Sequence, residues 1–256
     1  SRQALPTVLR EECPPGTNMF ERRQTPSALG LGLVDRVPDA VLLAGADPGD
    51  SNSDGISGRA RMSGDRVGRF GHKAAVPTLK DFAADALFNE LGLTINPALS
   101  SFATASDGDS VQDPEMSDAE FLDMAFFLAH IAPPARRIPP EPAAAQRVAE
   151  GEEVFSLAGC GACHLPSLAG IDGPVRAYSD FLLHDVANPA RYQVGEPGVD
   201  PREFRTAPLW GLRDTGPYLH DGSAETAEAA VLEGHFGEAT AARTAFEALD
   251  ADGRAK

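Results

Sequence analysis

The chain has 256 residues, of which 42% are hydrophobic and 23% are charged, ordinary values for a globular protein able to bury a core. It carries 22 Lys and Arg against 38 Asp and Glu, so its formal net charge is −16. This acidity argues against a nucleic-acid partner and against adsorption to an anionic membrane surface, both of which need a basic face. No apolar stretch approaches the roughly 20 residues that span a bilayer, so we expect no transmembrane segment.

The first half of the chain carries three helix signals. They are a Pro in a first turn, a run of apolar residues at helical spacing, and a Ser–Glu capping box. We expect the corresponding helices over 38–45, 77–93 and 118–131, with extended chain over 1–25 and an Asp- and Ser-rich loop over 101–115.

The second half begins with a stiff Pro-rich linker over 133–142. A helix with Pro in its first turn is expected over 143–157, ending at Gly159, and a shorter helix over 224–234, ending before His235. Alternating β-branched runs are few and no internal repeat is visible. Strands are therefore expected to be minor.

Two of the three cysteines lie in the motif Cys160-Gly161-Ala162-Cys163-His164, the attachment signature of c-type haem. Residues three apart on a helical turn share a face, so two thiols reach one porphyrin, and the following His binds the iron from below. A thioredoxin-type pair would need a βαβ unit nearby, and a zinc site would need further ligands at matching spacing. We therefore expect one haem c, attached through Cys160 and Cys163, with His164 as an axial ligand.

The second axial ligand is not a downstream Met, because all four methionines precede the motif. The remaining candidates are three imidazoles and three phenols: His184, His220, His235, Tyr178, Tyr192 and Tyr218. We favour His235, which directly follows an expected helix and precedes Gly237, where backbone can approach a flat cofactor. The alternative for His235 is a surface position at a helix C-terminus. The alternative interpretation of His184 is a buried core histidine. For His220, the alternatives are a turn residue and a hydrogen-bond partner for a haem propionate.

An acidic loop upstream places Asp50, Asn52 and Asp54 at alternating positions before a Gly, like the first half of an EF-hand. The twelfth position is Arg61 instead of Glu, so the full motif fails. A Ca²⁺ site completed from elsewhere and an acidic turn without metal are the two interpretations.

Several stretches together resemble the di-haem cytochrome c peroxidase and MauG superfamily, most closely its di-haem oxidoreductase (thiol oxidoreductase-like) branch. They cover nearly the whole chain from about residue 20. These stretches are 20–26, 30–33, 54–59, 68–71, 115–118, 132–137, 160–164, 182–185, 205–212, 216–222 and 235–239.

The resemblance implies a mainly α fold of cytochrome c-like domains. We expect an amino-terminal peroxidase-like region without a haem motif over 1–135 and a haem-bearing cytochrome c domain over 136–256. In the family, the carboxy-terminal haem is six-coordinate and transfers electrons, and its distal ligand falls at His235. The resemblance also implies a haem pocket with Arg205 as a propionate partner, Trp210 on the ring edge or in the core, and Tyr218 and His220 nearby.

Two departures from the family bear on function. Only one Cys-x-x-Cys-His motif is present, so the family's first haem motif lies upstream of Ser1, belongs to another chain or was lost. His72 also stands where family members often carry a Trp between the haems. Because the chain starts without Met, we expect a processed or truncated product, with Cys13 as a free thiol or as a partner of a missing segment.

We therefore expect a periplasmic electron-transfer cytochrome with a bis-His haem, the electron-transfer half of a peroxidase-like enzyme, and a redox partner protein. The alternatives are a mono-haem subunit of a larger redox complex and a domain that keeps haem for stability. No catalytic residue is named for this chain. Gln24 and Asp35 are weak candidates for an acid–base site over the missing haem.

Overall fold

The computed structural model describes residues 21–191 and 193–256. The expected extended chain up to residue 20, Cys13 and Tyr192 therefore lie outside the described residues. Within them, helices dominate and every strand is two or three residues long. The expectation of a mainly α fold with minor strands is confirmed.

The first half contributes four helices, of which three were expected. Pro38 is the N-cap of the second helix. Ser117 and Glu120 form the capping box of the fourth, because each side chain accepts a hydrogen bond from the other residue's amide. The third is shorter than expected because the Thr78 side chain caps its start and Gly92, with φ of 71°, ends it. The bounds are α1 Leu31–Asp35, α2 Asp39–Gly45, α3 Leu79–Leu91 and α4 Asp118–Ala129.

The second half also contributes four helices, two of them expected. The expected start of α6 at residue 224 is wrong: the helix begins at Ala227, because the Thr226 side chain accepts a hydrogen bond from the Ala229 amide. The short helices α7 and α8 were not anticipated. The bounds are α5 Pro142–Leu157, α6 Ala227–Gly234, α7 Thr240–Glu247 and α8 Ala251–Arg254.

Three antiparallel strand pairs connect these helices. The last pair matters most for the site, because it aligns His184 with Phe204 and Leu183 with Arg205. The pairs are β1 Met62–Ser63 with β2 Arg66–Val67, β3 Leu168–Gly170 with β4 Gly173–Val175, and β5 Leu183–Asp185 with β6 Glu203–Arg205.

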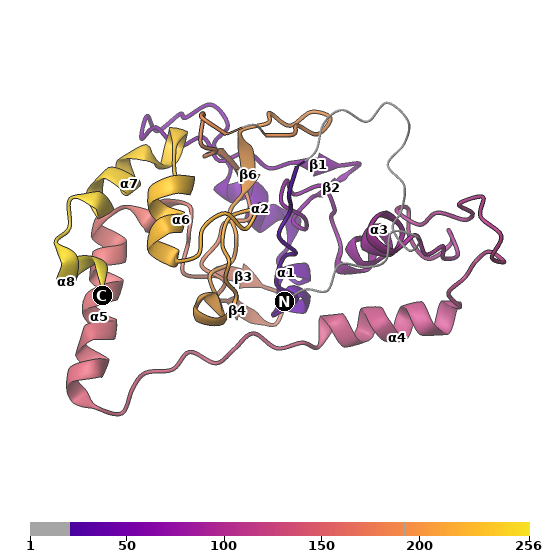
Figure 1. Ribbon diagram of the computed structural model, residues 1–256, viewed down its shortest axis with the longest axis horizontal. Coiled ribbons are helices and arrows are strands. Elements are labelled where there is room, and N and C mark those ends of the chain that lie inside the picture. Colours follow the sequence, from indigo (N-terminus) through magenta and orange to yellow (C-terminus); the bar gives the residue numbers. More distant parts are fainter. Residues whose placement is uncertain (1–20, 192) are drawn as a thin grey trace.

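Figure 1 shows α3 and α4 at one end of the molecule, α5 to α8 at the other, and the strand pairs between them. An extended segment runs from α4 to α5. The main hydrophobic core lies in the middle and joins side chains from both sides of residue 135: Val34, Val37, Leu42, Val67, Phe70, Val76, Leu79, Val175, Ala177 and Phe181. In the described part of the chain, no helix is both long enough and apolar enough to cross a membrane.

Candidate haem site

A cavity of about 960 Å³ opens beside α5, α6 and α7. Cys160, Cys163, His164 and His235 all line it. Much of the remaining wall is apolar and includes Val154, Phe155, Ala158, Leu219, Val231 and Phe246. The four sequence-predicted haem residues, up to 75 positions apart in the chain, thus meet at one cavity large enough for a large flat ligand.

The proximal side of the site is built where α5 ends. Gly159 has φ of 82° and turns the chain into a 3-10 turn over Cys160–Ala162, and the His164 amide donates to the Cys160 carbonyl at 3.0 Å. The His164 Nδ1 is 2.8 Å from the Tyr178 carbonyl, so Nδ1 carries the proton and Nε2 keeps its lone pair. Burial lowers the pKa of His164 to about 4, which leaves the ring neutral at pH 7.

The distal side is built where α6 ends. His235 is the C-cap residue, and its Nδ1 is 3.0 Å from the Ala230 carbonyl. This contact again places the ring proton on Nδ1 and leaves Nε2 as the lone-pair atom. Burial lowers the pKa of His235 below its ordinary value. The His164 and His235 ring centroids lie 6.4 Å apart, with 38° between the ring planes.

This separation fits two imidazoles on opposite sides of one metal ion. Metal–imidazole bonds of about 2.0 Å on each side hold the two nitrogens about 4 Å apart. The ring radius, roughly 1 Å for bonds of this length, extends the centroid separation to about 6 Å. With both thiols on the same cavity wall, the residues present fit a covalently attached haem.

His184, Tyr218 and His220 also line the cavity, but each of them contacts other groups. His184 has one nitrogen 2.9 Å from an Asp180 oxygen and the other 2.8 Å from a Glu238 oxygen. The Tyr218 hydroxyl donates to the Leu212 carbonyl at 2.6 Å. His220 stacks on Phe204, with ring centroids 4.2 Å apart. In the described residues, His235 is the candidate whose ring faces His164 at the separation of two axial ligands.

The Tyr178 side chain packs edge-on against Phe155. Its backbone carbonyl, by contrast, serves the site by accepting from His164. Asp35, the weak acid–base candidate, accepts from the Leu79 amide at 2.8 Å, and burial raises its pKa. Gln24 lines the large cavity, and its carbonyl lies 2.9 Å from Nε2 of His72.

Arg205 lines the cavity without a carboxylate partner in the described part of the chain. Its Nε donates to the Gly71 carbonyl at 2.8 Å and Nη1 to the Thr206 carbonyl at 3.0 Å. Burial lowers its pKa to about 10, so the guanidinium stays charged at pH 7. Trp210 is not among the cavity-lining residues; it packs on Gly30 beside the main core.

Sequence reasoning missed several polar groups around the cavity. Arg243 of α7 stacks over Phe236 at 4.2 Å and has a buried Nε that finds no hydrogen-bond partner among the described residues. Asp180 and Glu238, the partners of His184, were also missed. Glu238 lies in the stretch after His235 that resembles the family, but no local pattern indicates which acid meets which histidine.

The candidate calcium loop turns its acidic groups toward its own backbone. Asp50 accepts from the Gly55 amide at 3.2 Å, and Asp54 accepts from the Ile56 amide at 2.9 Å. The Asn52 side-chain oxygen accepts from the Asp54 amide at 3.0 Å. These contacts are those of an acidic turn, and the calcium site remains a prediction.

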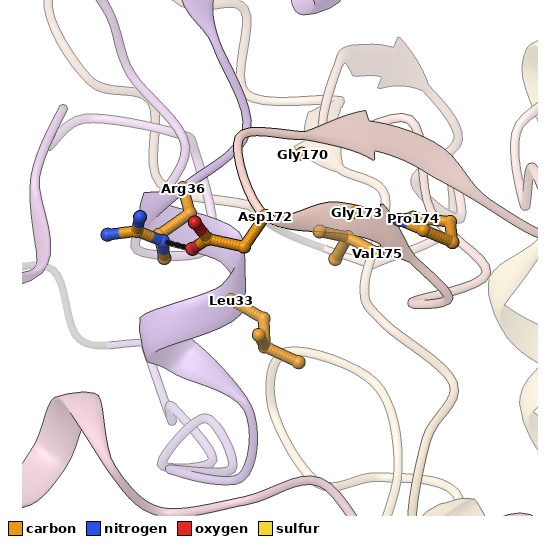
Figure 2. A pocket seen from close by; sticks show the side chains of 7 residues that line it. All are labelled: Leu33, Arg36, Gly170, Asp172, Gly173, Pro174 and Val175. Atoms are coloured by element: carbon orange, nitrogen blue, oxygen red, sulfur yellow. Dashed lines mark hydrogen bonds and ion pairs between the residues drawn. The ribbon is translucent and has the colours of Figure 1, made fainter.

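A second, smaller pocket of about 120 Å³ lies between α1 and the β3–β4 hairpin (Figure 2). Its two charged groups, Arg36 and Asp172, form an ion pair with each other at the surface. Because this pair satisfies both charges, the pocket offers no group for chemistry, and the large cavity is the candidate site.

Comparison with known families agrees with this geometry. A family model described as "Di-haem oxidoreductase, putative peroxidase" matches residues 15–256. No curated protein matches the chain.

Proposed function

Because the chain belongs to the di-haem oxidoreductase family and is a redox haem protein, we propose that it carries one haem c and transfers electrons through it. Cys160 and Cys163 hold the haem covalently, and His164 and His235 bind its iron from the two sides. The observation that carries this proposal is the pair of neutral imidazoles, 6.4 Å apart, on a cavity that both thiols line.

The chain's own residues define what such a site does. When bound, the haem supplies a one-electron redox centre. The carbonyls of Tyr178 and Ala230 orient the two imidazoles so that both Nε2 atoms are available to the metal. A haem held by both His164 and His235 would leave no iron position open to peroxide, which favours electron transfer over turnover at this centre. Arg205 supplies a positive charge for a propionate carboxylate.

The wider assembly follows from the count of motifs. The family is di-haem, whereas this sequence has a single Cys-x-x-Cys-His. We infer that a second haem, on another segment or chain, performs any peroxidase-like step while this centre supplies electrons through a redox partner. Covalent maturation of haem c takes place outside the cytoplasm, so the proposed compartment is the periplasm. A mono-haem subunit of a larger redox complex is the second candidate, supported by the same single motif.

Expression in cells that mature c-type haem tests the proposal. Intact mass and a pyridine haemochrome spectrum should show one haem per chain, joined by two thioethers, with a low-spin ferric spectrum. The matched control is the double variant Cys160→Ser, Cys163→Ser, which should retain no covalent haem. An unmodified polypeptide mass for the native sequence would contradict the proposal.

A further inference from the structure

A buried ionic triad lies beside the attachment motif. His184 is 2% exposed, and its Nε2 and Nδ1 contact the Asp180 and Glu238 carboxylates at 2.9 and 2.8 Å. Burial opposes a charge on this ring, but hydrogen bonds with Asp180, Cys163 and Glu238 raise the pKa of His184 well above its ordinary value. His184 is therefore an imidazolium between two carboxylates.

The triad joins the two sides of the haem site. On the proximal side, the Asp180 amide donates to the carbonyl of Cys163, the residue before His164, at 3.0 Å. The Cys163 sulfur lies 3.8 Å from Nδ1 of His184. On the distal side, Glu238 follows His235 by three residues. One chain of short contacts thus runs from the segment that carries one imidazole to the segment that carries the other.

Glu238 is also the anchor of the distal segment. It accepts from the Ser57 amide at 2.9 Å, the Ser57 hydroxyl at 3.0 Å and the Asp185 amide at 3.0 Å, in addition to His184. The backbone at Gly237 also lies against β5, so closely that a Cβ on Gly237 would clash with the Asp185 carbonyl. The loop after His235 is therefore held against β5 at close range.

Two members of the triad, Asp180 and His184, also form with Cys163 a cluster that resembles a metal site. Ligand atoms of Cys163, Asp180 and His184 lie within 4.8 Å of one another. Both His184 nitrogens already face carboxylates, so neither is available as a metal ligand without breaking an ion pair. The cluster is better explained as a brace than as a second metal centre.

We propose that Asp180, His184 and Glu238 are positioning residues that brace the proximal and distal segments against each other and so keep His235 on the haem iron. This inference rests on the proposed haem ligation. The new element is that these three side chains, none of which binds the iron, hold the distal ligand in place. Without that network, α6 would end in a loop whose imidazole leaves the iron readily.

The test compares Glu238→Ala with Glu238→Asp in the haem-loaded protein. Alanine removes every contact of the anchor, whereas aspartate keeps the charge but is one methylene too short to reach Ser57 and His184 together. The readouts are the ferric spin state and the rate at which CO binds the ferrous haem, which requires His235 to leave. We expect Glu238→Ala to bind CO on the order of tenfold faster or more, because loss of a buried ionic partner shifts an equilibrium by at least that factor. Glu238→Asp should fall between it and the native protein.

Glu225→Ala is the charge-matched control, because Glu225 is exposed and has no ion pair in the described residues. It should leave spin state and CO rate unchanged, and far-UV circular dichroism should show that all variants retain the native fold. If Glu238→Ala does not fold, the spin state and CO-binding rate of Glu238→Asp alone test the proposal. Native spin state and CO rate in the folded Glu238 variants would overturn the brace, while a native protein without low-spin haem would instead overturn the proposed function.

Discussion

The histidines of this chain differ most in what their ring nitrogens contact. His164 and His235 each use Nδ1 on a backbone carbonyl, which is the arrangement that directs Nε2 to a metal. His184 uses both nitrogens on carboxylates, and His72 uses Nε2 on the Gln24 carbonyl. These contacts distinguish the proposed ligands His164 and His235 from the proposed brace residue His184 and from His72, which is hydrogen-bonded to backbone.

The first residue-scale prediction concerns the distal ligand. His235→Ala should convert the ferric haem from low spin to high spin, because one axial position loses its imidazole. His220→Ala is the control and should remain low spin, since His220 stacks on Phe204. Absorption and electron paramagnetic resonance spectra give the spin state. A His235→Ala protein that stays low spin would move the ligation to another residue.

The second residue-scale prediction concerns acid stability. Burial opposes the Glu238 charge, but contacts with His184, Asp185 and Ser57 lower the pKa of Glu238 to about 2. The unfolded chain takes up this proton near pH 4.3, so the stabilisation by Glu238 is present above that pH and is lost as the pH falls toward 2. The difference in unfolding free energy between the native protein and Glu238→Ala should therefore shrink from pH 5 to pH 2. Urea unfolding across this range measures it, and a pH-independent difference would contradict the assignment.

The helices at the two ends of the molecule are stabilised in different ways. At one end, α3 and α4 bury side chains against each other, including Leu87 and Phe121. At the other, none of the residues of α5, α6, α7 and α8, all of which the structure describes, is buried. Their apolar side chains line the cavity instead. We therefore expect the proposed haem to complete the core of this half, as a cofactor that contributes to folding.

The element-scale prediction follows from this contrast. The haem-free variant Cys160→Ser, Cys163→Ser should lose order in α5 to α8, because surface ion pairs such as Arg147–Asp252 add little without a core. About half of the α-helical residues lie in these helices, so the helical circular dichroism signal should fall by up to that fraction. Hydrogen exchange locates the change. Protection of α3 and α4 is the internal control, and equal protection at both ends would contradict the prediction.

At the scale of the whole molecule, the arrangement is compatible with the proposed electron carrier, whose iron would be held by His164 and His235. The candidate haem cavity adjoins the main hydrophobic core, because Val34, Phe70 and Phe181 belong to both. The net charge of −16 disfavours binding to acidic partners. It favours a redox partner protein whose docking face is basic.

The whole-molecule prediction concerns peroxide. This chain alone should show little haem-dependent peroxide turnover with a reduced artificial donor, because the proposed ligands His164 and His235 would leave no iron position open. His235→Ala should raise that turnover by opening one position. Assays that add a protein carrying the second haem test whether this centre feeds it. Appreciable turnover by the native chain alone would show that its iron site is open.

Local features of the site and fold could be predicted from sequence because they depend on spacing along the chain. The Cys160–His164 turn, the Ser117 capping box and the end of α5 at Leu157, just before Gly159, all arise within a few residues, where backbone geometry leaves few choices. The start of α6 was missed because Thr226, two residues beyond the expected start, provides the cap.

Only the tertiary structure decided what meets across the cavity. His164 and His235 are 71 positions apart, and their 6.4 Å separation depends on how α5, α6 and β5 pack. The partners of His184 were equally hidden, because an acidic chain offers 38 carboxylates and no local pattern selects Asp180 and Glu238. By itself, the sequence determined the mainly helical class and predicted the haem-attachment motif, since both depend on short-range patterns. The ligand pair and its brace depend on long-range packing, which brings distant side chains together only when the whole chain folds.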